Sequence, residues 1–492
     1  MYIGIDCGTQ GTKAIVWDEG RVIGQGFTPH KTQAAQIGQR EQSPHNWLDA
    51  LATSVNLAFS GQERLKGAVK GIGISGQQHG LVLIDHQHQV IRDAMLWCDT
   101  RAHQILKEFV ESRASHFVSD IGIQVPVAFT IAKLLWIKRY EPKTFARIHR
   151  IMLPHEFLNW SLTGRYAIEP GDASGTGWFD TRSKSLSEAM FAELGIAHTF
   201  ERPDVLASED VVGTLTPQVA ERLGLKQHVI VSSGGGDNMM AAIGTGNVDQ
   251  GQLTISLGTS GTLFSHCYQQ VDSYHHPDLN AFCSSSNGYL PLASTMNVTT
   301  ANNQILSLTN SSLDEFDTLL SSSPIGANGL SALPFFDGAR LPNVPNATGA
   351  VLGITSSNLS PANLLRATVE GVTFNLQRGA KTLKDAGVNF ERACVIGGGA
   401  NSRAWRQLIS DVLNIPLWTP TCTEAAAIGG AIQALWAYEN QFSPCELTTL
   451  CQEYIKCKQS NSTNPISTNV QQYTSIATNY HQTVNNHMAQ FQ

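Results

Sequence analysis

Short apolar runs alternate with helix-like patterns in the first part of the chain, which predicts a mixed α/β arrangement. Residues 2–5 and 69–74 are apolar runs of strand length, and residues 22–27 form a further strand pattern. Between them lies a helical pattern with apolar positions at Leu48, Leu51, Val55 and Ala58. Strands followed by helices at this density indicate a lobe built around a sheet.

The strand–turn–strand theme begins again after about Gly246, which predicts an internal duplication. A long helix is expected over residues 360–386, followed by a strand over 393–396 and two further helices. The last part of the chain is rich in Ser, Thr, Asn and Gln. We therefore expect an N-terminal lobe over 1–245, a C-terminal lobe over 246–440, and a polar, partly helical segment over 441–492.

One short phrase occurs in both halves. Residues 6–12 read Asp-Cys-Gly-Thr-Gln-Gly-Thr, and residues 256–262 read Ser-Leu-Gly-Thr-Ser-Gly-Thr. Each follows an apolar run and precedes another, as in a β-hairpin. Turn N–H groups and Thr hydroxyls can donate to phosphate oxygens. The repeat predicts a polyphosphate held between two hairpins, with candidate ligands Gly8, Thr9, Thr12, Gly258 and Thr259; the alternative is two unrelated tight turns.

Two aspartates are candidates for the chemistry. Asp6 stands at the mouth of the first phrase, where a carboxylate beside a polyphosphate needs a cation, so we expect it to hold Mg²⁺ through water. The alternative is an Asp that caps a turn. Asp237 follows three glycines at the end of a strand, which leaves room for a substrate, and it is a candidate general base for a sugar hydroxyl. The alternative is an ordinary Gly-Asp turn.

Other polar segments suggest where a sugar and a nucleotide bind. Gln78 and His79, between two glycines, and Asn238 can hydrogen-bond sugar hydroxyls, and Trp97 offers an apolar face. A lone His or Trp is, however, often structural. Residues 397–399 are three glycines between a strand and a helix, a context typical of nucleotide sites. The spacing is neither GxGxxG nor GxxxxGK[ST], which argues against a Rossmann dehydrogenase and a P-loop NTPase.

Composition and charge exclude several classes of protein. The 492 residues are 42% hydrophobic and 15% charged, which is typical of globular domains. A net charge of −7 and no basic run argue against a nucleic-acid partner. Neither a signal peptide nor a membrane span is apparent, so we expect a cytoplasmic protein. Nine scattered cysteines without a CxxC pair indicate reduced thiols and no zinc site.

Taken together, these motifs resemble the FGGY-type family of carbohydrate kinases, over nearly the whole chain. The resemblance implies two ribonuclease-H-like lobes of the actin/hexokinase/Hsp70 ATPase type around a central cleft. It implies ATP and Mg²⁺ as cofactors, and a homodimer as the common assembly. It also implies a catalytic base at Asp237, a metal-side carboxylate at Asp6, sugar contacts from Gln78 and His79, and an ATP site lined by Thr9, Thr259, Gly398, Gly399 and Ser402.

The Gly-Gln-x-His-Gly form of residues 76–80 is most similar to family members that phosphorylate D-xylulose. We therefore expect D-xylulose as the sugar. A kinase of another pentulose or polyol, such as ribulose, gluconate or glycerol, is the alternative, and an actin- or Hsp70-like ATPase is a more distant one. The segment 297–304 is unusually polar for this subgroup, and its effect on ATP or sugar contacts stays open.

Overall fold

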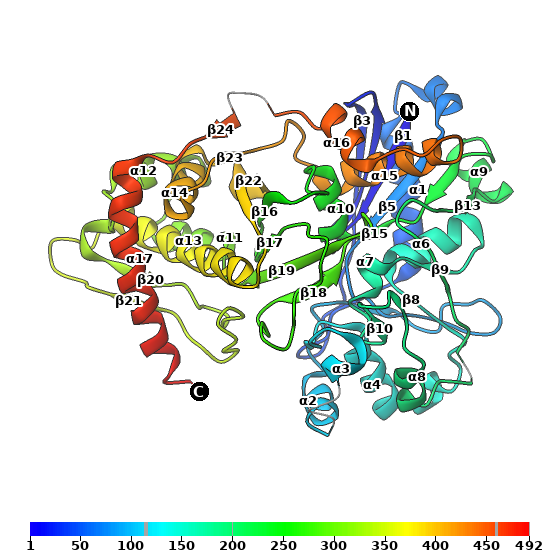
Figure 1. Cartoon of the computed structure of the whole chain (residues 1–492), viewed down its shortest axis with the longest axis horizontal. Coiled ribbons are helices and arrows are strands. Elements are labelled where there is room, and N and C mark those ends of the chain that lie inside the picture. The colour runs from blue at the N-terminus through cyan, green and yellow to red at the C-terminus, as the bar shows by residue number, and fades with distance from the viewer. Residues whose placement is uncertain (113–116, 199, 458–460, 492) are drawn as a thin grey trace.

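The computed structural model describes residues 1–112, 117–198, 200–457 and 461–491. Two seven-stranded sheets, one in each half of the molecule, carry helices on their faces (Figure 1). This arrangement confirms the predicted α/β class with two lobes. Residues 458–460, within the polar segment expected after residue 440, lie outside the described residues.

The N-terminal sheet has the strand order β13-β14-β5-β1-β2-β3, and β15 also pairs with β5. Strands β1, β2 and β3 are antiparallel neighbours, whereas β5 runs parallel to β1 and β14 runs parallel to β5. The strands are β1 (Tyr2–Cys7), β2 (Gly11–Asp18), β3 (Arg21–Pro29), β5 (Gly71–Gly76), β13 (Val211–Thr214), β14 (Ile230–Ser232) and β15 (Gly235–Gly236).

The C-terminal sheet has the order β18-β19-β17-β16-β22-β23-β24. Its central five strands, β19-β17-β16-β22-β23, repeat the order and directions of β3-β2-β1-β5-β14, which confirms the predicted duplication. The strands are β16 (Gly251–Leu257), β17 (Gly261–Phe264), β18 (Asn280–Cys283), β19 (Tyr289–Thr295), β22 (Phe390–Ile396), β23 (Leu417–Trp418) and β24 (Ser462–Thr463).

Two helices, α10 (Asp237–Gly244) and α15 (Ala425–Asn440), pack on each other and on the N-terminal sheet. A Cβ at Gly4 of β1 would lie 1.8 Å from the carbonyl oxygen of Ala427, so only glycine permits this approach. Residues 425–440 therefore lie on the N-terminal sheet, although the sequence predicts them in the C-terminal lobe. The sequence also did not predict that Asp237 begins a helix.

The remaining elements cover the sheets and form small ribbons. In the N-terminal half the helices are α1 (Pro44–Ala58), α2 (His103–Glu111), α3 (Phe117–Ile121), α4 (Thr130–Tyr140), α5 (Pro142–Phe145), α6 (Pro154–Thr163), α7 (Pro170–Ala173), α8 (Glu188–Leu194) and α9 (Pro217–Leu223). Antiparallel two-stranded pairs are β4 (Glu41–Gln42) with β7 (Ala94–Met95), β6 (Val82–Ile84) with β8 (Arg150–Met152), β10 (Phe179–Asp180) with β11 (Ser185–Leu186), and β20 (Ser331–Leu333) with β21 (Ala350–Leu352). Strands β9 (Ala167–Ile168) and β12 (Asp204–Val205) pair in parallel.

The C-terminal lobe is built around the long helix α13 (Pro361–Asp385), which begins at Ser360 as its N-cap, as the sequence predicts. The other helices in the second half are α11 (Thr299–Leu308), α12 (Phe316–Ser322), α14 (Arg403–Leu413), α16 (Leu447–Tyr454) and α17 (Ser467–Met488). Figure 1 shows α17 running along the outer side of this lobe, so the polar C-terminal segment contains a long helix.

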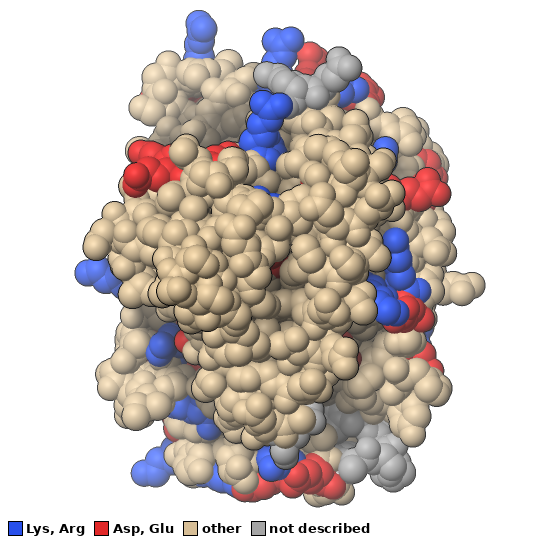
Figure 2. Space-filling view, turned by 90° about the vertical axis from the view of Figure 1, so that its left-hand side faces the viewer, with Lys and Arg blue, Asp and Glu red and all other residues tan. Residues whose placement is uncertain are grey.

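The segment after residue 440 serves both lobes. Tyr454, which ends α16, packs edge-on against Trp17 of β2, with 5.0 Å between ring centroids. Tyr480 of α17 contacts Phe374 of α13 at 4.9 Å. The chain carries no Asp, Glu, Lys or Arg after Lys458. Accordingly, Figure 2 shows few charged side chains at the centre of the face on which α17 lies.

Candidate active site

The first repeated phrase forms the turn between β1 and β2. The Gly8 N–H donates to the Gly11 carbonyl oxygen at 3.0 Å. The Thr9 hydroxyl donates to the Gln77 side chain at 3.0 Å and accepts from the Trp97 indole N–H at 3.0 Å. The turn is thereby attached to the segment after β5, where the sequence predicts the sugar site.

Thr12, the last residue of the first phrase, is fully buried within the N-terminal lobe. Its hydroxyl lies 2.9 Å from the His30 ring, and its carbonyl oxygen accepts a hydrogen bond from Ser54 at 2.9 Å. The structure thus gives the Thr12 side chain a role in holding β2 and leaves it no exposed surface for a nucleotide. This placement departs from the predicted ATP contact, because alternation along β2 turns this side chain inward.

Asp6 is half-buried at the end of β1, beside the first turn. The Ser75 hydroxyl, on the adjacent parallel strand β5, donates to Asp6 Oδ1 at 2.9 Å. Burial raises the pKa of the Asp6 carboxyl to about 6, with Glu424 adding to the rise. A carboxylate in such surroundings is stabilised by a nearby cation, which fits a metal-side role.

Asp237 is the first residue of α10 and is half-buried. Gly234, with φ of +73°, makes the turn from β14 that no residue with a side chain would make without strain. Asp237 Oδ1 accepts from the Asn238 backbone N–H at 2.8 Å and from its side-chain amide at 2.9 Å. Burial, together with the negative charges of Asp6 and Asp172, raises the pKa of Asp237 to about 7. Such a carboxyl can accept a proton near neutral pH.

Gln78 and His79 are almost fully buried, and Gln78 lies beside Gly236 and Asn238, the neighbours of Asp237 in the chain. The Gln78 side-chain oxygen accepts from the Asn238 amide at 3.0 Å, so these two predicted sugar contacts are linked. The His79 ring lies 4.9 Å from the Phe129 ring, and a Cβ at Gly175 would collide with it at 2.1 Å. Burial, reinforced by positive charges nearby, lowers the pKa of His79 to about 3. The imidazole is therefore neutral at pH 7 and can both donate and accept.

The second repeated phrase forms the turn between β16 and β17. The Gly258 N–H donates to the Ser260 carbonyl oxygen at 3.1 Å. The N-terminal end of α11 holds this turn, because the backbone N–H groups of Val298 and Thr299 donate to the carbonyl oxygens of Thr259 and Gly258, each at 3.0 Å. The Thr259 side chain is exposed and available to a ligand.

The glycine triplet after β22 has the expected strand–turn–helix context. Gly397 has φ of +85°, and a Cβ there would lie 2.7 Å from the Leu257 carbonyl oxygen. Gly398 is exposed, and apart from its two neighbours in the chain no described residue has an atom within 4 Å of the point that a Cβ would occupy, so a ligand has room to approach it. Ser402 is the N-cap of α14 and accepts from the Trp405 N–H at 2.9 Å. Its hydroxyl also donates to Asp317, so Ser402 already has a protein partner.

Two contacts join the lobes at the site. The Thr262 hydroxyl of β17 donates to the Asn238 side-chain oxygen at 3.0 Å. The Arg340 guanidinium lies 5.9 Å from the Trp97 ring centroid. The structure therefore brings Asp6, Gln78, Trp97, Asp237 and Asn238 to the junction of the two sheets. Gly398, Gly399 and Ser402 lie on the C-terminal lobe, beyond the second turn.

Sequence reasoning missed a buried polar cluster behind Asp237. His155 Nδ1 lies 2.8 Å from Asp172 Oδ2, and both side chains are fully buried. The Glu169 carboxylate accepts from the backbone N–H groups of Gly171 and Asp172 and from the Ser285 hydroxyl. The sequence feature that could have indicated this cluster is the glycine-rich stretch around residues 171–177, since glycines there leave space for the buried side chains.

Lys133 was also not predicted as a site residue. Its side chain is fully buried, and its ammonium group donates to the carbonyl oxygens of Ala128 at 2.6 Å and Phe129 at 3.1 Å. Burial lowers the pKa of Lys133 to about 7, although Asp99 opposes the shift. Lys133 and Arg340 are the positive charges that depress the pKa of His79.

Two features are absent from the described part of the chain. None of the described helices is long and apolar enough to cross a membrane. Within residues 1–112, 117–198, 200–457 and 461–491, no group of three or more His, Cys, Asp or Glu side chains could hold a metal ion.

Models of known families match both halves of the chain. The model for the FGGY family of carbohydrate kinases, N-terminal domain, matches residues 1–244, and that for the C-terminal domain matches residues 253–438. Two domains of one kinase family thus span the two sheets. The chain belongs to the FGGY family of carbohydrate kinases, and it is an ATP-dependent sugar kinase.

Several individual members of this family are similar to the chain in sequence or in structure. The chain is 43% identical over 485 residues to a xylulose kinase of Haemophilus influenzae, covering 96% of this chain and 97% of that protein. A crystal structure described as a "xyloylose kinase" from Brucella ovis superposes with a TM-score of 0.92 at 28% identity, with 99% of each chain covered. A gluconate kinase from Lactobacillus acidophilus has a TM-score of 0.90 at 21% identity, over 100% and 98% of the chains, and so shares the fold.

Proposed function

We propose that this protein phosphorylates D-xylulose, converting ATP and D-xylulose to ADP and D-xylulose 5-phosphate. The observation that carries the chemistry is Asp237, a half-buried carboxyl with a pKa of about 7 at the start of α10. The choice of sugar is supported by the relative named xylulose kinase, which is 43% identical along nearly the whole chain. Gln78 and Asn238, linked at 3.0 Å beside Asp237, supply polar groups for the sugar.

In this mechanism Asp237 is the general base. The O5 hydroxyl of the sugar attacks the γ-phosphorus of ATP, the bond from phosphorus to the ADP oxygen breaks, and the hydroxyl proton passes to Asp237. The raised pKa of Asp237 suits it to accept that proton near neutral pH. Asn238 donates two hydrogen bonds to the same carboxylate oxygen and thus fixes its orientation.

The two turns are proposed to bind the phosphates of ATP. Gly8 and Thr9 belong to the first turn, and Gly258 and Thr259 to the second. Backbone N–H groups at such turns suit phosphate oxygens, and so does the exposed Thr259 hydroxyl. The Gly8 and Gly258 N–H groups and the Thr9 hydroxyl already have partners within the protein.

Gly398 leaves space beside the second turn for the nucleoside. Gly399 is buried, and a Cβ there would lie 2.6 Å from the Trp405 ring, so it serves packing within the lobe, and the Ser402 hydroxyl is already held by Asp317. ATP binding is proposed mainly through Gly398 and Thr259.

A magnesium ion fits the carboxylates at this site. Asp6 accepts from Ser75, and its negative charge raises the pKa of Asp237. Oxygen ligands from a carboxylate and from phosphates are those that Mg²⁺ prefers. When bound, Mg²⁺ would neutralise the charge of the phosphates, and Asp6 would hold it through water.

The test is a coupled assay of ADP release with D-xylulose, L-xylulose, D-ribulose, L-ribulose, gluconate and glycerol. D-xylulose should give the highest kcat/KM. In the Asp237→Asn variant kcat should fall about 10³-fold, because a positioned general base contributes roughly 10²–10⁴-fold. The matched control is Asp314→Asn, an exposed carboxylate on the surface of the C-terminal lobe, which should keep wild-type activity.

Each half of this proposal can fail separately. Turnover of another sugar in preference to D-xylulose would overturn the assigned substrate and leave the kinase. An Asp237→Asn variant that retains wild-type kcat would overturn the general base. Tight binding of D-xylulose by the variant, measured by calorimetry, would show that the loss of kcat is not a loss of the fold.

A further inference from the structure

Arg340 is a cation at the junction of the lobes for which the described residues supply no acidic partner. It lies in the loop between β20 and β21 of the C-terminal lobe, yet its guanidinium lies 5.9 Å from the ring centroid of Trp97, in the N-terminal lobe. No carboxylate of the described residues lies within ion-pair distance of it, and the protein atoms crowded around its guanidinium lower its pKa by desolvation. The side chain nevertheless keeps exposed surface through which a ligand can reach it. A guanidinium without a counter-ion in such a place suits a site that receives an anion.

The loop that carries Arg340 is held by the second phosphate turn. Asn297 donates from its amide to the Gly338 carbonyl oxygen at 2.9 Å and accepts from the Asp337 N–H at 3.1 Å. Val298, the next residue, donates its N–H to the Thr259 carbonyl oxygen at 3.0 Å. The position of Arg340 is thus tied through Asn297 to the turn that contains Thr259.

On its other side Arg340 faces the first phosphate turn and the sugar site. Trp97, against which it lies, donates its indole N–H to the Thr9 hydroxyl at 3.0 Å. Arg340 is also close enough to His79 to lower the pKa of that imidazole. Arg340 is therefore tied to the second turn through its own loop and lies against Trp97, which is hydrogen-bonded to the first turn.

Other cations near this place are already engaged. Lys13 of β2 forms an ion pair with Glu424 at 2.5 Å. Lys133 is fully buried and donates to two backbone carbonyl oxygens. Arg101 is paired with Asp99 and Glu41. Phosphoryl transfer spreads negative charge over the three outer oxygens of the moving group, and a guanidinium can stabilise that charge with two parallel hydrogen bonds.

We propose that Arg340 binds the transferred phosphoryl group, donating hydrogen bonds to its outer oxygens as it passes from ATP to the sugar. The proposal rests on the sugar-kinase function proposed above. The new oxygen–phosphorus bond forms on the sugar, the bond to ADP breaks, and the sugar proton goes to Asp237. Arg340 keeps its own protons throughout and remains next to the phosphate of the product.

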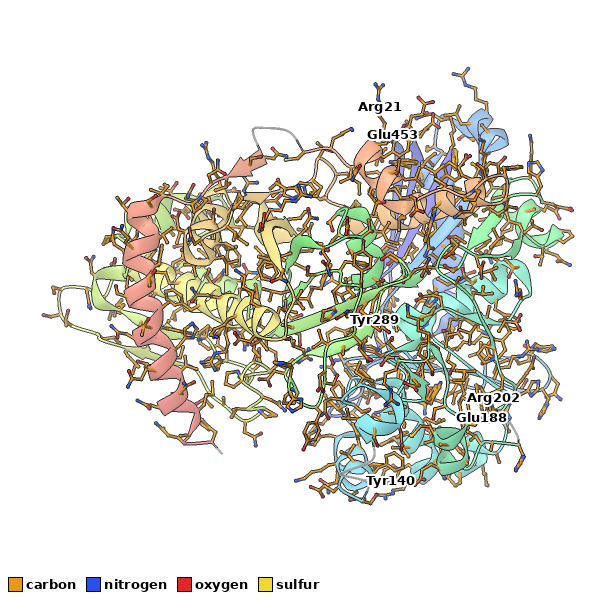
Figure 3. The ribbon with its side chains drawn as sticks, in the orientation of Figure 1. Arg21, Tyr140, Glu188, Arg202, Tyr289 and Glu453 are labelled. Carbon is orange, nitrogen blue, oxygen red and sulfur yellow. The ribbon has the colours of Figure 1, made fainter. Side chains whose placement is uncertain are left out.

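The experiment compares the Arg340→Gln and Arg340→Lys variants with the wild type and with Arg21→Gln. Arg21, at the upper edge of the N-terminal lobe in Figure 3, is exposed and points away from the protein. For each protein, kcat is measured with saturating ATP and D-xylulose. The affinities for D-xylulose and for D-xylulose 5-phosphate are measured separately by calorimetry without nucleotide.

Arg340→Gln should lower kcat by about 100-fold or more, since a guanidinium on the moving phosphoryl group contributes roughly 10³-fold or more in well-studied cases. It should weaken the sugar phosphate about tenfold and leave D-xylulose within about twofold. Arg340→Lys should recover part of kcat, because an ammonium keeps the charge and loses the paired geometry. Arg21→Gln should match the wild type in all three quantities.

Three outcomes would overturn the proposal. Equal loss of affinity for D-xylulose and its phosphate would make Arg340 a sugar contact or a support for Trp97. Unchanged kcat and unchanged affinities would leave it without a role in the reaction. An Arg340→Gln variant that does not fold, beside an Arg340→Lys variant with wild-type kcat and phosphate affinity, would give it a structural role only. If the wild type phosphorylates a different sugar, the substrate proposal fails, and the same measurements with that sugar and its phosphate still test Arg340.

Discussion

The two repeated turns, proposed to bind the phosphates of ATP, share a sequence pattern and differ in what surrounds them. In the first, Cys7 pairs with Thr12 across the hairpin, whereas in the second Leu257 pairs with Gly261, so the two hairpins differ by one residue in their pairing register. The first turn begins after a carboxylate, Asp6, and the matching position of the second is Ser256. Thr9 is hydrogen-bonded to Gln77 and Trp97, whereas the side chain of Thr259 is exposed.

The strands beside these turns extend the comparison. Asp6 pairs with Ser75 of β5, and Ser256 pairs with Ile396 of β22. The segments that follow, residues 76–80 and 397–399, therefore occupy equivalent places in the two lobes. One contains the predicted sugar contacts and the other the predicted nucleoside site. Duplication has fixed the position of both loops, and the side chains at equivalent points decide which ligand each can take.

The largest effect should come from exchanging the residues that distinguish the turns. Asp6→Ser makes the first turn resemble the second and should lower kcat about 10²–10³-fold, because it removes the proposed metal-side charge. Ser256→Asp, which makes the second turn resemble the first, should mainly raise the KM for ATP, since it adds a charge beside the phosphates. Steady-state kinetics over a range of Mg²⁺ concentrations measures both.

The contrary result for the exchange is also informative. If Ser256→Asp restores activity to an Asp6→Ser protein, the two turns are interchangeable and the assignment of separate tasks is wrong. Asp314→Asn serves as the control for a carboxylate that is removed from the surface without effect.

The dependence of kcat/KM on pH tests whether Asp237 is the general base. Asp237 has to be ionised to accept a proton, and its pKa is raised to about 7. The ionised fraction then falls about 50-fold from pH 7 to pH 5, so kcat/KM should fall by at least that factor. Protonation of Asp6, with a pKa of about 6, would steepen the fall. The residual kcat/KM of Asp237→Asn should lack the part of this fall that is due to Asp237. A wild-type kcat/KM that does not change between pH 7 and pH 5 would contradict the assignment of Asp237 as the general base.

Much of this comparison was accessible from the sequence alone. Local patterns predicted the hairpins, the duplication, the α13 helix and the third glycine turn, because each depends on residues close together in the chain. The return of α15 to the N-terminal sheet was not predictable, since it depends on glycines of β1 and β5 that touch a helix more than 350 residues away.

The site divides in the same way. Asp6 and Asp237 stand out because their neighbours in sequence are glycines and strands. The contact of Arg340 with Trp97 joins residues 243 positions apart and was not predictable from local patterns. The buried pair His155–Asp172 was marked only indirectly, by the glycines around residues 171–177. Thr12 shows the reverse case: its sequence neighbours suggest a phosphate ligand, and packing against His30 and Ser54 buries it. The individual site assignments stay predictions.

The free energy of unfolding, measured at two pH values, tests whether the ionised Asp237 carboxylate destabilises the folded protein. The pKa of Asp237 rises from 3.8 to about 7 on folding, so its stabilising effect is complete below pH 3.8 and is lost as the pH rises through 7. Asp237→Asn should therefore increase the free energy of unfolding by about 2 kcal/mol at pH 8 and change it little at pH 4. Urea denaturation at both pH values measures the difference.

An equal gain in stability at pH 4 and pH 8 would contradict the electrostatic explanation, since it would then come from packing. Asp314→Asn, at an exposed position, should change the urea midpoint at neither pH.

The smallest expected effects are the changes in KM caused by Thr9→Val in the first turn and Thr259→Val in the second. Thr9→Val removes the acceptor of the Trp97 indole and the donor to Gln77, so it should raise the KM for the sugar about tenfold. Thr259→Val removes an exposed hydroxyl without a side-chain partner among the described residues, so it should raise the KM for ATP about threefold and leave the sugar unaffected. The two KM values are measured for each variant under the same conditions.

Valine keeps the shape of threonine, so the pair isolates the hydroxyl groups and each variant serves as the control for the other. If both variants raise the KM for ATP equally and neither changes the KM for the sugar, the turns are equivalent phosphate clamps. The hydrogen bonds from Trp97 and to Gln77 would then only hold the first loop in place. If the effects separate as expected, the first turn couples the phosphate site to the sugar site through Trp97, the residue against which Arg340 also lies.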